Sequence, residues 1–157
     1  MKFLRAQRLN DKVCNYADLL RDTLDRDTYE VLWIGALATL RAVGHTIKHE
    51  AKSDEKARRI VSDRHRLSAD NPKMNWLLES RNLALKENDL RINVDEANEL
   101  EVATTAGIRP AGTYKELGVF VQSAVGIFDI PYPEEIICDC VYMWDQEILA
   151  IRADERW

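Results

Sequence analysis

The segment from Asp27 to Glu50 constrains the fold most, because its first turns carry apolar side chains on every side. Asp27-Thr-Tyr-Glu30 also matches a capping box, which favours a helix start there. A helix with one side in water needs only one apolar stripe, so a helix that is apolar all round is expected to be buried among others. The run from Val31 to Leu40 is too short for a membrane span, which needs roughly 20 residues. We therefore predict that this segment is the central helix of a bundle.

Four more segments show the apolar spacing or the start signals of helices. Two of them cover about residues 10–24, after an Asn10-Asp11 cap, and about residues 53–69. The other two begin at Pro72 and Pro133, each with proline in the first turn. The last helix carries the clearest apolar stripe in the chain, formed by Ile137, Cys140, Val141, Trp144, Ile148 and Ile151.

Residues 89–130 break this helical pattern, and every glycine except Gly35 and Gly44 lies within them. Residues 100–104 alternate like a strand, and residues 118–122 fit its partner. Residues 113–116 match a capping box, so a short helix is an alternative there.

These patterns predict a mainly α protein with a single domain over residues 1–157. We expect a compact bundle of about five helices, with a small β-hairpin or irregular insertion at about 89–130 between helices four and five.

The composition is that of a soluble globular protein, 46% hydrophobic and 31% charged. A net charge of −5 argues against a general attraction to nucleic acid. The N-terminus becomes charged within its first five residues, so we expect no secretion signal and no membrane association. Cys14, Cys138 and Cys140 are odd in number, and Cys138 and Cys140 cannot readily pair because they are two residues apart on a helix, which favours reduced thiols in the cytoplasm.

Arg81 raises the main question about function. On a helical wheel it lies at the centre of an apolar stripe, with Asn82 beside it. Burying a guanidinium without a partner costs several kcal/mol, so Arg81 needs an anionic or carbonyl partner. We expect either an internal carboxylate or an anion held in a cleft or a dimer groove. The stripe consists of Met74, Leu77, Leu78, Ala84 and Leu85, and the candidate carboxylates are those of Glu30, Asp145 and Glu147.

Arg81-Asn82 near the end of a helix resembles the HEPN superfamily, whose ribonucleases carry R-[N/D/H]-x(3–5)-H and cleave RNA as homodimers without a metal. Residues 40–45 (LRAVGH), Trp76, residues 79–82 and Lys86-Glu87 are similar to a group of uncharacterised small bacterial proteins with LRAVGH and ERN-x-x-LKE-like motifs. The resemblance covers most of residues 27–152. It implies a HEPN-like helical domain that forms a homodimer or binds a protein partner.

The chain departs from the HEPN ribonucleases where their motif places histidine, because Lys86-Glu87-Asn88 stands there. Neither lysine nor glutamate titrates near neutrality unless it is perturbed. The first hypothesis is therefore a catalytically silent interaction protein that uses the surface of the helix carrying Arg81 and Asn82. The alternative is a metal-independent ribonuclease of toxin type, in which Arg81 holds the phosphate and His45 replaces the motif histidine.

A third hypothesis is an anion or nucleotide binder. The candidate catalytic residues are Arg81, Asn82 and His45, and the candidate binding residues are Arg41, His45, Arg81, Asn82 and Glu87. His45 and His49 have the spacing of a metal pair, but no third ligand follows at a recognisable offset, so we expect no metal site. No nucleotide- or cofactor-binding motif is present, and we expect no cofactor.

The helix over residues 53–69 carries a basic stripe formed by Lys52, Lys56, Arg59 and Arg66. Such a stripe can follow a phosphate backbone, which makes RNA an alternative partner. No aromatic residues alternate with these cations, and an acidic run follows soon after. We therefore favour a solvated outer face.

Overall fold

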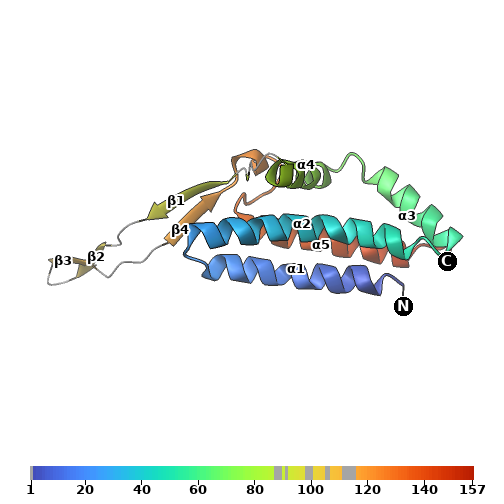
Figure 1. Ribbon diagram of the computed structural model, residues 1–157, viewed down its shortest axis with the longest axis horizontal. Helices are drawn as coiled ribbons and strands as arrows, with labels where there is room; N and C mark the ends of the chain where they lie inside the picture. The colour runs from blue at the N-terminus through green and yellow to red at the C-terminus, as the bar shows by residue number, and fades with distance from the viewer. Residues whose placement is uncertain (1, 87–89, 91, 98–100, 105–106, 111–115) are drawn as a thin grey trace.

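The computed structural model describes residues 2–157 except 87–89, 91, 98–100, 105–106 and 111–115 (Figure 1). It confirms a mainly helical bundle with a small β insertion between the fourth and fifth helices. The helices are α1 (Leu4–Asp22), α2 (Arg26–Glu50), α3 (Glu55–Leu67), α4 (Pro72–Lys86) and α5 (Pro133–Arg152). The insertion contains β1 (Asn93–Ala97), β2 (Glu101–Thr104), β3 (Gly107–Pro110), β4 (Glu116–Phe120) and the short 3₁₀ helix η1 (Gln122–Ala124).

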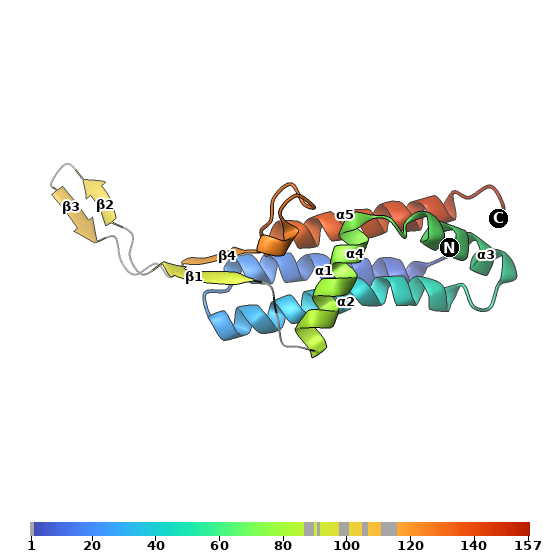
Figure 2. The ribbon, with the colours of Figure 1, turned by 90° about the horizontal axis from the view of Figure 1, so that it is seen from above.

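Helix α2 is the central helix, as predicted, because it contacts α1, α3, α4 and α5. Helices α1, α2 and α5 lie side by side along the long axis of the molecule, and α4 crosses over α2 (Figure 2). The prediction that the first turns of α2 are buried on every side is wrong at Val31, whose side chain is 68% exposed. The described part of the chain leaves that side of α2 uncovered. No helix in this part of the chain is long and apolar enough to cross a bilayer.

Local signals set the starts of three helices. Asn71 Oδ1 accepts hydrogen bonds from the backbone nitrogens of Lys73 and Met74 at the start of α4, as its predicted cap requires. Asp54 caps α3 in the same way. Helix α2 begins slightly earlier than predicted, because its N-cap is Asp25, whose carboxylate accepts from the Thr28 nitrogen (2.8 Å).

Helix α1 begins at Leu4, so the predicted start at Asn10-Asp11 is wrong. The carboxylate of Glu50 accepts hydrogen bonds from the backbone nitrogens of Arg5 (3.1 Å) and Ala6 (2.9 Å). This carboxylate satisfies the free N–H groups of the first turn, a role that a neighbouring side chain usually fills. The cap therefore comes from the far end of α2.

The strands form two antiparallel pairs, β1 with β4 and β2 with β3. The predicted pairing of residues 100–104 with residues 118–122 is wrong, because β2 pairs with the nearer β3 and β4 returns to β1. The alternative helix start at residues 113–116 is wrong at Glu116, which opens β4, and its other residues lie outside the described chain.

The buried side chains of all five helices form one core. The predicted stripe of α5 is buried along its whole length. Aromatic rings attach the end of the insertion to the bundle, since Trp76 lies between Phe128 (5.1 Å) and Trp33 (6.4 Å). Trp33 Nε1 donates to the Leu90 carbonyl oxygen (3.2 Å), so the chain that leaves α4 is also fixed to α2.

Candidate functional site

Helix α4 turns a different face to the core from the one its apolar stripe predicts. Its buried residues are Trp76, Leu77, Ser80 and Ala84. Two residues of the predicted stripe, Leu78 (38% exposed) and Leu85 (48% exposed), face outward. Arg81 is therefore half-buried at the edge of the core-facing surface, and the prediction that it lies at the centre of the driest face is wrong.

Arg81 has few partners in the described part of the chain. Its Nη1 donates to Asn82 Oδ1 (3.1 Å), while its Nε is buried and has no acceptor among the described residues. The predicted internal ion pair is not found there, because each candidate carboxylate binds another side chain. These pairs are Glu30 with Arg26, Asp145 with Asn10, and Glu147 with Arg64.

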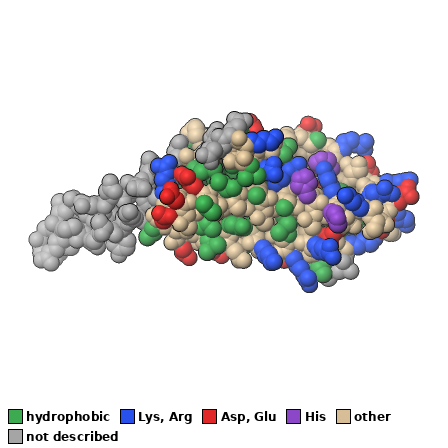
Figure 3. Space-filling model, viewed as in Figure 1, with side chains coloured by type: hydrophobic (Ala, Val, Ile, Leu, Met, Phe, Trp, Pro, Cys, Tyr) green, Lys and Arg blue, Asp and Glu red, His purple; other side chains and the backbone are tan. Residues whose placement is uncertain are grey.

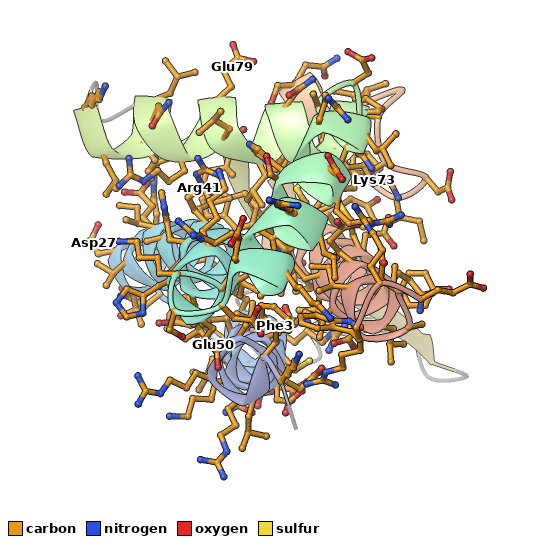
Figure 4. The ribbon with its side chains drawn as sticks, turned by 90° about the vertical axis from the view of Figure 1, so that its right-hand side faces the viewer. Phe3, Asp27, Arg41, Glu50, Lys73 and Glu79 are labelled. Carbon is orange, nitrogen blue, oxygen red and sulfur yellow. The ribbon has the colours of Figure 1, made fainter. Side chains whose placement is uncertain are left out.

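Two further predicted residues, Arg41 and His45, lie within the electrostatic range of Arg81. Arg41 lies between α2 and α4 (Figure 4). Glu79, which precedes Arg81 by two residues on α4, points away from α2 in the same view. Burial and then the charge of Arg81 lower the pKa of Arg41. Burial also lowers the pKa of His45, one turn further along α2, and Arg41, Lys48 and Arg81 add to that effect. Arg41 and His45 thus lie within range of the charge of Arg81, and the anion-binding hypothesis stays a prediction.

Helix α3 supplies a histidine that the sequence analysis missed. His65 Nε2 lies 3.2 Å from Lys48 Nζ. Burial, Lys48 and Arg41 lower the pKa of His65, and Glu147 opposes that shift. Lys48 follows His45 along the same edge of α2, which is a usable sequence signal, but nothing local to α3 singles out His65.

Arg41, His45, Lys48 and His65 border a pocket of about 30 Å³ where α2, α3, α4 and α5 meet, and Arg81 is not among its lining residues. Its charged and polar lining residues include Arg41, His45, Lys48, His65 and Glu147. Its apolar wall consists of Ile47, Val61, Met74, Trp144 and Ile151. Lys, Arg and His side chains gather over this half of the visible surface, where α3 lies beside α2 (Figure 3).

Glu147 is the one acidic side chain among the described residues that line the pocket, and it is already paired. Arg64 donates to both of its carboxylate oxygens (3.3 and 2.9 Å). Such a bidentate ion pair leaves little negative charge for the other cations. The pocket therefore keeps a net positive character.

Gly44 allows the pocket wall to form. A Cβ atom at this position would lie 2.7 Å from Cη2 of Trp144, closer than two carbon atoms can pack. Glycine thus lets the indole ring of α5 lie directly against α2.

The remaining predicted residues contribute little to this site. Asn82 contacts Arg81 only through the hydrogen bond described above, and Glu87 lies outside the described residues. On α3, Arg59 pairs with Glu55 and Arg66 with Asp63, as the solvated-face interpretation predicts. No group of three His, Cys, Asp or Glu side chains that could hold a metal ion occurs in the described ranges.

The arrangement is suited to binding a small anion, because two cations, Arg41 and Lys48, and the ring N–H groups of two histidines converge beside an apolar wall. Comparisons with protein-family models, with curated proteins and with solved structures found no match to this chain. The functional argument therefore depends on the geometry of the pocket.

Proposed function

We propose that the protein is a catalytically silent, HEPN-like cytoplasmic binding protein that holds an oxyanion, such as a phosphate group, between α2, α3 and α4. One observation supports this most directly. The half-buried guanidinium of Arg41 lies near Arg81 and His45, and no carboxylate binds Arg41 or Arg81 among the described residues. Like charges held together in a partly buried place are unfavourable, and a bound anion reduces that cost.

The size of the pocket indicates the kind of ligand. About 30 Å³ of the pocket is open to the centres of water-sized molecules, whereas about 10–15 Å³ of such space is enough to hold one water. This is room for one small group, so we expect a ligand that presents a single oxyanion group to the cations and keeps any larger part outside the pocket.

Titration with inorganic phosphate and sulfate tests the proposal. Amide resonances of α2 and α3 should shift in a saturable way, and Arg41→Gln should weaken binding by about tenfold or more, since one charged contact contributes roughly 1.5–3 kcal/mol. Arg8→Gln removes the same charge from the exposed side of α1 and should leave the affinity unchanged. Absence of saturable binding, or an equal loss with both variants, would refute the proposal.

The ribonuclease is a second candidate, because His45 lies near Arg81. Its lowered pKa keeps the imidazole neutral at pH 7, and a neutral imidazole can accept a proton. We expect no cleavage of RNA by the purified protein in the presence of a chelator. Cleavage that persists in the chelator and is lost in both Arg81→Gln and His45→Gln would replace the binding proposal with the ribonuclease.

Helix α4 also supports the proposed homodimer. Leu78 and Leu85 are seven residues apart, so they project from one side of the helix, and both are exposed. A second copy of the chain that packs against this side would bury both leucines. Sedimentation should therefore show a dimer that Leu78→Lys dissociates, with Leu149→Lys on the exposed part of α5 as the control. A monomeric wild-type protein would exclude this partner.

A further inference from the structure

The contact between α1 and α5 fixes which side chains of these helices face each other. At one end, Arg152 Nη2 of α5 donates to the carbonyl oxygen of Phe3, just before α1 (3.2 Å). At the other end, Arg21 of α1 donates to the carboxylate of Glu135 in α5 (3.4 Å). The two helices therefore run antiparallel along their whole length.

Cys14 and Cys138 lie on the same side of this contact. Asn10, one turn before Cys14, donates to the carbonyl oxygen of Val141, which follows Cys138 by about one turn (2.9 Å). Arg21, two turns after Cys14, donates from Nη2 to Sγ of Cys138 (3.8 Å). Cys138 therefore lies opposite the part of α1 between Asn10 and Arg21, and Cys14 lies within that part.

The electrostatic environment of the thiols agrees with this placement. Burial raises the pKa of Cys14, and Cys138 is the next largest cause, ahead of every nearby carboxylate. The hydrogen bond to Cys138 is the largest cause that raises the pKa of Arg21. Both thiols are exposed, whereas Cys140 is buried and its pKa is raised to about 12.

We propose that Cys14 and Cys138 are a thiol-oxidation site, at which a peroxide forms a reversible disulfide between α1 and α5. Cys138 reacts first, because the Arg21 guanidinium holds its sulfur in a charge-assisted contact. Its thiolate attacks hydrogen peroxide, the O–O bond breaks, and the products are a sulfenic acid and, after protonation, water.

Cys14 completes the reaction. Its sulfur attacks the sulfenic sulfur, the S–O bond breaks, and the thiol proton leaves with the hydroxide as a second water. Two thiols have then lost two electrons and two protons to one peroxide. A dithiol reductant reverses the step by thiol–disulfide exchange.

The disulfide would connect the first and last helices of the bundle. It closes a loop of roughly 120 residues, and cross-links across long loops restrict the unfolded chain most. We expect the oxidised protein to melt at least about 5 °C higher than the reduced protein.

Brief treatment of the full-length protein with hydrogen peroxide tests the site. Intact-mass measurement should show a loss of about 2 Da, the two hydrogens removed when a disulfide forms. Peptide mapping should place the cross-link between residues 14 and 138, and dithiothreitol should reverse it. Cys14→Ser and Cys138→Ser should each abolish the cross-link.

Cys140→Ala is the matched control, because it removes the third thiol and should leave the cross-link intact. Circular dichroism confirms that each variant is folded before oxidation. Three results would overturn the proposal: a cross-link that involves Cys140, disulfides only between molecules, or addition of oxygen to single cysteines without loss of two hydrogens.

Discussion

The α1–α5 contact and the pocket beside α2 both place polar side chains between helices. They differ in whether those side chains have hydrogen-bond or ion-pair partners within the protein. In the α1–α5 contact, Asn10 is fully buried, and its Nδ2 donates to the Val141 carbonyl oxygen and to Asp145 (both 2.9 Å). Its Oδ1 has no donor among the described residues. At the pocket, Arg41 has no carboxylate bound to it in the described part of the chain, and neither has Arg81, whose charge acts on Arg41.

This difference separates a structural role from a binding role. Buried polar groups in folded proteins are almost always hydrogen-bonded, so the partnered Asn10 stabilises the fold. Cations that lack an internal partner leave their donors available to a ligand. Substitution in the α1–α5 contact should therefore reduce stability, and substitution at the pocket should mainly reduce binding.

The largest expected effect follows from Asn10→Ala, which removes both hydrogen bonds of the buried amide. We expect the free energy of unfolding to fall by about 1–3 kcal/mol, because the Asp145 carboxylate loses a donor in a partly buried place. Urea unfolding followed by circular dichroism measures this change. Asn15→Ala, at an exposed position of the same helix, is the control and should change stability by less than about 0.5 kcal/mol. An equal effect of the two substitutions would contradict the structural role.

The second prediction concerns ligand-linked stability. Sulfate at ten times its Kd should stabilise the folded protein by about 1.4 kcal/mol, relative to chloride at the same ionic strength. Asn10→Ala should keep this increment although it is less stable, because the pocket is separate from the α1–α5 contact. Arg41→Gln should lose it. Thermal melts of the wild type, Asn10→Ala and Arg41→Gln in sulfate and in chloride measure this increment. If Arg41→Gln is stabilised by sulfate as much as the wild type, the pocket does not bind the anion.

Local sequence was sufficient for parts of the fold and not for others. The start of α4 follows from the Asn71 cap and Pro72, and the start of α5 from Pro133 in its first turn, all of which lie next to the helices they begin. The start of α1 depends on Glu50, which is far away in sequence, so no local pattern contains it. Strand pairing failed for the same reason, because alternation predicts a strand and does not choose between two partners.

The site shows the same limit. Arg41 and His45 share an edge of α2, and Arg81 is conspicuous within α4, so the sequence named all three. His65 joins them only because α3 folds back beside α2, which its own pattern does not predict. The helical wheel put Arg81 at the centre of the predicted buried face because only apolar residues were used to define that face. In the structure, the crossing of α4 over α2 buries Ser80 and leaves Leu85 exposed.

The third prediction tests whether Arg81 has a carboxylate partner inside the protein. Removal of one partner from a buried ion pair typically costs about 3–5 kcal/mol. Arg81→Gln should cost less than about 1 kcal/mol, because it strands no carboxylate among the described residues and keeps much of the side-chain stem. Arg64→Gln is the comparison and should cost more, since it strands Glu147, whose side chain is 14% exposed. Denaturant unfolding measures both, and a loss above 3 kcal/mol for Arg81→Gln would identify an internal partner.

The smallest expected effect is on the pH dependence of stability, through the lowered pKa values of His45 and His65. In the unfolded chain both residues take up protons near their ordinary pKa of 6.5, whereas the folded protein binds them only at lower pH. The unfolded state then holds more protons, so stability decreases as the pH falls below 6.5 and levels off once the folded histidines are also protonated. The melting temperature should therefore be lower at about pH 5.5 than at about pH 7.5.

This pH dependence should come from the pocket and respond to its ligand. His45→Gln and His65→Gln should each reduce the difference in melting temperature between the two pH values. His49→Gln, which removes an exposed histidine of α2 that does not line the pocket, should not. Bound sulfate adds a negative charge beside both imidazoles and favours their protonated forms, so it should also flatten the dependence. If sulfate reduces the pH dependence of the melting temperature equally in Arg41→Gln, the anion binds outside the pocket. The pocket would then differ from the α1–α5 contact in no way that concerns anion binding.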